Sequence, residues 1–427
     1  MKLTGLSFDA LPPIDLPFRF FICAPFFMLL CAGVILVSGE SLWLSRWQPS
    51  MLALIHGFTL GFLTMVMLGA LLQLLPVIAG IGIVKPRPVA CFSHALLSLG
   101  TLSLMAGFMY FDALLIYSAM LLLALALGVY IAALIWVLIK KLSQGDSIWG
   151  FRLATFSLLV VTLLGLALLA RNLGVEWIPT TKMVTNVHAL WGLTGWAGIL
   201  IIAVSFQVIP MFHVAPAFPL WVRRFLIPAI FIALILSIAF PTLGLAAING
   251  LHAIFALVLL FVIHQRKRKV PDTSIRYWQL GALALLLSSL LFFIPETLWN
   301  RYLAVNKTHL LVALFLFFYL MSIIQGMLLK ILPFLSYTHL QQRCLINFEA
   351  MQYIPNMHEF LNKKHGQWLF YLHIISGLLL IFVLAWPSLY AAFAVSLALE
   401  SIGLLAIMLK IMSLYFAVNT KISQAAK

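Results

Sequence analysis

Long apolar runs alternate with short polar connections along this chain. An α-helix rises about 1.5 Å per residue, so about 20 apolar residues cross the hydrocarbon core of a bilayer. The pattern predicts twelve such helices, at residues 16–38, 50–79, 88–108, 112–139, 149–171, 181–212, 219–240, 243–265, 276–295, 302–333, 367–386 and 388–416. We therefore expect an all-α, polytopic membrane protein, with residues 1–427 in a single transmembrane domain.

The composition agrees with an integral membrane protein. Of the 427 residues, 64% are hydrophobic and 9% are charged, and the mean hydropathy is +1.12. Soluble domains carry about 25% charged residues, which argues against a water-soluble fold. No nucleic-acid-binding motif accompanies the net charge of +15. We expect membrane lipid as a partner, and no nucleic acid.

Basic residues are divided unevenly between the two faces that the predicted helices define. One face receives all but five of the 26 lysines and arginines. The five exceptions are Arg46, Arg171, Lys182, Arg301 and Lys307. Positively charged loops stay in the cytoplasm. The pattern thus predicts a multi-pass protein of a bacterial-type inner membrane with both termini cytoplasmic. A polar, partly helical loop at about 334–366 is expected on the same side.

Three segments repeat one pattern, a histidine followed by a proline 20, 22 or 24 residues later. The pairs are His56 with Pro76, His188 with Pro210 and His309 with Pro333. They lie on the second, sixth and tenth predicted helices, with the histidines roughly 10–12 Å below the outer surface. This spacing predicts three pseudo-repeated four-helix arcs, at about 16–139, 149–265 and 276–416, with the three repeat helices at inner positions.

These histidines are the main candidates for chemistry. An ionisable residue inside a membrane is costly and commonly marks a functional site. Neutral imidazole binds heme iron and copper, and two imidazoles from facing helices make a six-coordinate heme. His56, His188 and His309 are therefore candidate cofactor ligands, with His252 as a fourth candidate for a metal. The alternative for each is a structural hydrogen bond or packing contact between helices.

Two charged residues lie within the predicted spans. Glu400 is in the middle of its helix, where we expect a polar contact or a role in proton handling. Lys330 lies near a cytoplasmic helix end, from which its amine can extend to the interface. His94 and His373 are predicted near cytoplasmic helix ends, and His213 at a helix end, so all three are expected to be interfacial or solvated.

Glycines surround two of the repeated histidines. They are Gly57, Gly61 and Gly69 after His56, and Gly192, Gly195 and Gly198 after His188. Small residues allow membrane helices to approach closely, and packing is the favoured interpretation. Room for a flat porphyrin is the alternative.

The predicted architecture resembles the catalytic subunit of heme–copper oxidases, and more closely the NnrS family, whose members are heme- and copper-containing membrane proteins linked to nitric oxide response. The segments similar to the NnrS family are residues 17–21 and His56 with Leu60-Gly61-Phe62 and Pro76, whereas residues 195–210 resemble the histidine-bearing tenth helix of the cytochrome-c-oxidising branch. The resemblance implies b-type heme on His56 and His309, with His188 left for a second heme or metal. Copper is a further implied cofactor.

The sequence also departs from the oxidases. The seventh predicted helix, 219–240, lacks the histidines that bind copper there, and Lys307-Thr308-His309 replaces a His-x-His motif. A complete heme–copper centre and oxygen reduction are therefore not expected. We predict electron transfer or handling of a diatomic gas, with a redox partner or a partner membrane subunit. The alternatives are a cofactor-free transporter and an assembly or scaffold subunit with the oxidase fold.

Overall fold

The computed structural model describes residues 12–80, 82–140, 145–175, 182–267, 269–303, 305–345 and 348–425. Throughout these ranges the regular structure is helical, without strands, and twelve helices are long and apolar enough to cross a membrane. The prediction of an all-α polytopic membrane protein is confirmed. The division into three repeated arcs stays a prediction.

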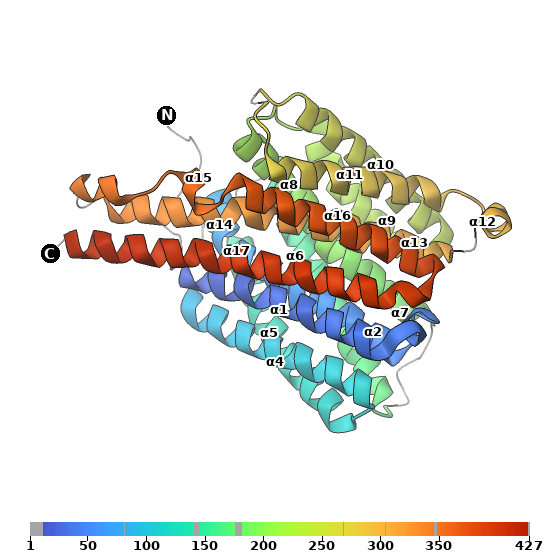
Figure 1. The fold of residues 1–427 in the computed structure, drawn as a ribbon. Coiled ribbons are helices and arrows are strands. Elements are labelled where there is room, and N and C mark those ends of the chain that lie inside the picture. Colours follow the sequence, from blue (N-terminus) through green and yellow to red (C-terminus); the bar gives the residue numbers. More distant parts are fainter. Residues whose placement is uncertain are drawn as a thin grey trace.

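Several of the twelve spans are built from more than one helical segment (Figure 1). The first six spans are α1 (Asp15–Ser38) with η1 (Gly39–Trp43); α2 (Pro49–His56), η2 (Gly57–Thr64) and α3 (Met65–Ala79); α4 (Pro86–Tyr110); α5 (Ala113–Lys140); α6 (Asp146–Asn172); and α7 (Lys182–Leu190), η3 (Trp191–Gly198) and α8 (Ile199–His213). The last six are η4 (Val222–Leu226) with α9 (Ile227–Ala239); α10 (Pro241–His264); α11 (Thr273–Phe292); α13 (Lys307–Ala313), η5 (Leu314–Met321) and α14 (Ser322–Arg343); α16 (Lys363–Ala385); and η7 (Pro387–Leu389) with α17 (Tyr390–Ala425). The short elements α12 (Glu296–Tyr302), η6 (Phe348–Tyr353) and α15 (Met357–Phe360) lie in connections.

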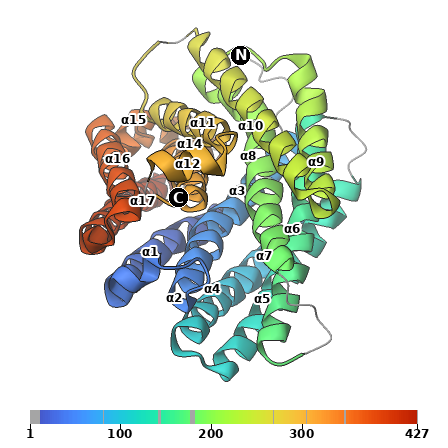
Figure 2. The same cartoon turned by 90° about the vertical axis from the view of Figure 1, so that its right-hand side faces the viewer.

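The spans that carry His56, His188 and His309 occupy the centre of the bundle, as predicted. In the most apolar 18-residue stretch of these spans, 83%, 72% and 78% of the residues are buried, against 28–50% in the other described spans. A central helix has neighbours on all sides, whereas an outer helix turns one face to lipid. Figure 2 shows α3 and α8 inside the bundle, with α5, α9 and α16 at its periphery.

Each central span contains an eight-residue π-helical segment, namely η2, η3 and η5. π-Helical turns are rare and occur frequently at functional sites. The segments η2 and η3 are joined by a buried hydrogen bond, in which Trp196 Nε1 donates to Thr64 Oγ1 at 3.1 Å. This bond links the second span to the sixth in the interior.

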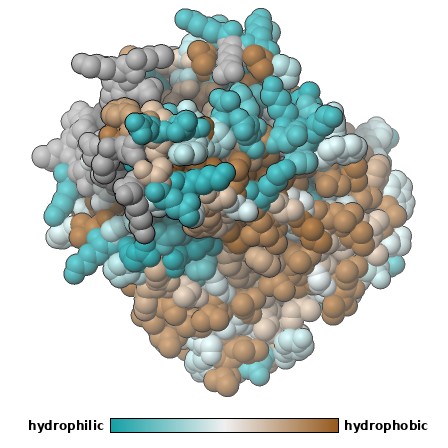
Figure 3. All heavy atoms as spheres, turned by 60° about the vertical axis from the view of Figure 1, so that its left-hand side comes forward, coloured by the Kyte–Doolittle hydropathy of each residue, from teal (hydrophilic) through white to brown (hydrophobic). Residues whose placement is uncertain are grey.

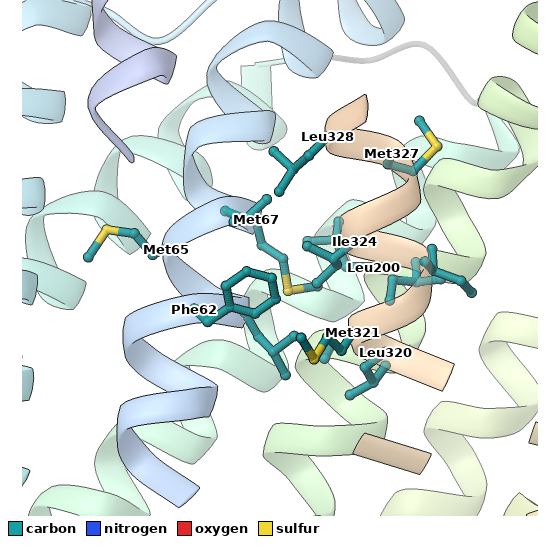
Figure 4. Packing of buried hydrophobic residues seen from close by; sticks show 14 of the residues in the cluster. Phe62, Met65, Met67, Leu200, Leu320, Met321, Ile324, Met327 and Leu328 are labelled. Carbon is teal, nitrogen blue, oxygen red and sulfur yellow. The ribbon is translucent and has the colours of Figure 1, made fainter. Parts of the chain in front are cut away.

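Apolar side chains fill the space between the central spans. Phe62 and Met67 from the second span meet Leu200 from the sixth and Met321 and Ile324 from the tenth (Figure 4). All five side chains are buried. An apolar cavity of about 60 Å³ lies in this region, and Met67, Leu200 and Ile324 are among the residues that line it.

The predicted end of the tenth helix is wrong. We expected the helix to stop at residue 333, but α14 continues to Arg343. Beyond the apolar part it packs on α17, where the Tyr415 hydroxyl and His339 Nδ1 are 2.8 Å apart and Arg343 donates to Asn419 and Ser423. Hydropathy detects where a helix leaves the apolar region, whereas these polar contacts let the helix continue outside it.

The surface divides into a polar end and an apolar flank. Figure 3 brings forward the end of the molecule where α1 begins and α17 ends, and hydrophilic side chains gather there. Exposed large apolar residues on the flank include Phe26, Leu125, Ile232 and Phe382. The protein is thus built to contact lipid. That its polar end faces the cytoplasm stays a prediction.

Candidate metal centre

The structure brings two of the predicted ligands together. The imidazole rings of His56 and His188 have centroids 6.2 Å apart, with 25° between their planes. His56 is the last residue of α2 and His188 lies in α7, so each precedes the π-helical segment of its own span. Both side chains are partly buried.

Backbone carbonyls select the same tautomer in both rings. His56 Nδ1 lies 2.8 Å from the Leu52 oxygen, and His188 Nδ1 lies 3.1 Å from the Val161 oxygen. A carbonyl oxygen only accepts hydrogen bonds, so each Nδ1 carries the proton and each Nε2 keeps its lone pair. The structure gives neither Nε2 a partner among the described residues. This is how metal-binding histidines are held, with one nitrogen donating to a carbonyl and the other available to the metal.

Packing positions the two rings. The ring of Phe108 on α4 lies 5.6 Å from that of His56, on centroids. Gly165 on α6 faces His188 so closely that a Cβ added there would lie 3.0 Å from the His188 Cε1 atom. Gly165 could not be identified as a site residue from the sequence, because nothing in the sequence shows that α6 is the neighbour of His188.

His309 lies apart from this pair. It is at the start of α13, where Asn306 caps the helix by accepting a hydrogen bond from the His309 backbone N–H at 3.1 Å. Its ring makes no aromatic contact with His56 or His188 in the described part of the chain. The predicted pairing of His56 with His309 therefore stays a prediction.

His252 sits at a different depth. Its buried ring is 5.4 Å from that of Phe315, and its Nε2 would lie 3.8 Å from a Cβ on Gly198. Phe315 lies roughly 9 Å further along its span than His309, and Gly198 lies roughly 15 Å further along its span than His188. His252, which contacts both, is therefore deeper than the other candidate ligands. Accordingly, no group of three or more histidine, cysteine or acidic side chains among the described residues is arranged to hold a metal ion.

The glycines near the histidines serve helix packing, the favoured interpretation. A Cβ on Gly61 would lie 2.2 Å from Phe27, and one on Gly69 would lie 2.7 Å from Phe20, both on α1. A Cβ on Gly195 would lie 2.8 Å from the Ser157 hydroxyl. These glycines allow α1 and α6 to approach the central spans.

The expectation that His373 is interfacial is wrong. His373 is fully buried, where Nδ1 lies 2.7 Å from Glu400 Oε1 and Nε2 lies 2.7 Å from the Ser322 hydroxyl. Glu400 thus has the polar contact predicted for it. The interaction was missed because its members come from α14, α16 and α17, and sequence spacing does not show which helix faces are adjacent.

His213 is also buried rather than solvated. It lies beside Asp272, with 3.8 Å between His213 Nδ1 and Asp272 Oδ2. The same Asp272 oxygen accepts a hydrogen bond from Lys330 Nζ at 2.7 Å. Lys330 therefore extends toward the helix end as expected, but it ends in an ion pair. Burial alone would raise the pKa of Asp272, yet Lys330 and Ser274 hold that pKa below its usual range.

Comparison with known proteins adds no assignment. No model of a protein family matches the chain, and no curated protein is significantly similar to it.

Proposed function

We propose that this protein binds a redox-active metal centre, a b-type heme or copper, through His56 and His188. Its role is electron transfer or the handling of a diatomic gas such as nitric oxide. The observation that carries the proposal is the pair of facing imidazoles whose Nδ1 protons are fixed on backbone carbonyls.

The separation of the rings suits one shared metal ion. The two rings are stacked with 6.2 Å between their centroids, so both side chains are close enough to contribute to one site. A site with two imidazoles suits Cu(I) better than it suits a copper centre that requires three histidines.

The bound group would supply reversible one-electron transfer and, with an open coordination position, binding of a diatomic gas. The chain contributes ligand orientation through the Leu52 and Val161 carbonyls. It also contributes an apolar interior, since the cavity of about 60 Å³ has only apolar lining.

The resemblance to the NnrS family supports the same class of function, and we propose membership on the residues given for it. The seventh span, η4 with α9, carries no histidine. We therefore expect negligible oxygen consumption with reduced cytochrome or quinol as donor.

The test is the visible spectrum of the purified chain, with a pyridine hemochrome assay and metal analysis. A Soret band or stoichiometric copper is expected, and nitric oxide should shift the spectrum if one coordination position is open. A chain without heme and without bound metal contradicts the proposal and favours a transporter or an assembly subunit.

A further inference from the structure

A chain of hydrogen bonds joins three helices in the interior, away from the His56–His188 pair. Its members, Ser322, His373 and Glu400, have 0% exposed surface. The two hydrogen bonds are both 2.7 Å long. Phe317 stacks on the imidazole at 4.8 Å between centroids, with 8° between the planes, and holds the His373 ring in place.

Polar atoms without hydrogen-bond partners lie beside these three hydrogen-bonded residues. Glu400 Oε2, both amide atoms of Gln325 and the hydroxyls of Ser376 and Tyr277 are buried without a hydrogen-bond partner. Gln325 follows Ser322 by three residues in α14, and Ser376 follows His373 by three in α16, so they share helix faces with the chain. The Tyr277 ring on α11 is 5.4 Å from the imidazole. Buried polar groups of this kind bind water or a small polar ligand.

The Ser322 hydroxyl bonds to a side chain, whereas several other helical serines of this protein bond to the backbone. Helical serines such as Ser157 and Ser401 donate to the carbonyl four residues earlier. Ser322 instead bonds to the imidazole. A hydroxyl both donates and accepts. It donates to Nε2 of a neutral His373 and accepts from Nε2 of a protonated one, so protonation of His373 breaks no hydrogen bond.

We propose that Ser322, His373 and Glu400 form a proton-binding site in the membrane interior that exchanges protons with water. A hydronium ion gives a proton to Ser322 Oγ and becomes water, as the Ser322 hydroxyl proton moves to His373 Nε2. The Nδ1 proton of His373 then passes to Glu400 Oε1. The net change is that one hydronium ion becomes water and the Glu400 carboxylate becomes a neutral carboxylic acid.

A fixed ion pair is the simpler structural role, but it leaves the surrounding atoms unexplained. A buried pair without further hydrogen bonds does not regain its desolvation cost, and Glu400 Oε2 is unpartnered. A serine nucleophile would show the same three-residue geometry. The unpartnered polar atoms beside Ser322 suit bound water rather than the substrate that a nucleophile needs at its hydroxyl. Tyr277 is the further titratable group at the site.

The experiment is pH-induced infrared difference spectroscopy on the full chain in lipid vesicles. We expect a carboxylic-acid C=O band that grows as the pH falls, shifts in D2O and is lost in Glu400→Gln. Glutamine has the shape of glutamate and still accepts from His373, which favours folding of the variant. The exposed Glu296→Gln variant is the matched control and should keep the band.

Ser322→Ala gives a second readout that does not depend on the carboxyl variant. The band should persist and change frequency. Its shift in D2O should develop more slowly, because the variant lacks the Ser322 hydroxyl through which protons reach His373. A wild-type chain without a pH-dependent acid band, or a band that neither variant alters, overturns the proposal. Covalent labelling of Ser322 by a fluorophosphonate would also overturn it, in favour of a nucleophile.

Discussion

Hydrogen-bond partners decide what each buried histidine can do. In His56 and His188 a backbone carbonyl takes the Nδ1 proton, which leaves Nε2 for a metal. In His373 both nitrogens are engaged, by Ser322 and Glu400. The first arrangement suits ligation and the second suits proton transfer, although all three residues are histidines in membrane helices.

At the residue scale we predict an acid-dependent loss of stability from Asp272. Its pKa is lowered in the folded protein, so its ion pair stabilises the fold above the unfolded-state pKa of roughly 3.9 and is lost as the pH falls through the folded value. Asp272→Asn should remove about 1–2 kcal/mol at neutral pH, allowing for partial exposure. The check is the unfolding temperature measured from about pH 5 to about pH 3. In the wild type this temperature should fall as the pH falls, and in Asp272→Asn it should fall less steeply.

The exposed Glu40→Gln variant is the control for that series and should keep the wild-type slope. Equal slopes for wild type and Asp272→Asn would show that the Lys330 ion pair does not contribute to folding stability.

At the scale of elements, we predict that the link between η2 and η3 helps to hold His56 beside His188. Both histidines lie just before these segments, and Trp196 and Thr64 join the segments through one buried hydrogen bond. A shift of one span along the other would separate the imidazoles while each helix stayed intact.

Trp196→Phe tests this role. Loss of a hydrogen bond between membrane helices costs about 0.5–1.5 kcal/mol, and we expect a lower unfolding temperature together with a lower content of heme or metal. Trp278→Phe is the matched control, since Trp278 donates to the Met327 sulfur elsewhere in the core. A Trp196→Phe chain with full metal content would show that this bond does not position the site.

The positions of the helices could be predicted from sequence, whereas their partners and local geometry could not. Apolar length alone located all twelve spans, and the shared depth of His56 and His188 identified both as site candidates. The π-helical segments leave no hydropathy signal, because π and α turns bury the same residue types. The contacts of His373 depend on which faces of α14, α16 and α17 meet, a property of tertiary packing.

At the scale of the whole molecule, the twelve candidate spans among the described residues leave the start of α1 and the end of α17 at one end of the bundle (Figure 1). The basic residues predict that this end is cytoplasmic. Green fluorescent protein fused to the C-terminus should therefore fluoresce in bacterial cells, and alkaline phosphatase fused there should be inactive. The opposite pair of results would invert the orientation and place His56 and His188 near the cytoplasmic surface.

The most direct measurement of the central claim is the heme and metal content per chain in single-histidine variants. We expect His56→Ala and His188→Ala each to lose most of the bound group, and His94→Ala, near the opposite face, to keep it. If His309→Ala loses the group while His188→Ala keeps it, the axial pair is His56 with His309. Full occupancy in both His56→Ala and His188→Ala would contradict a metal centre at this site.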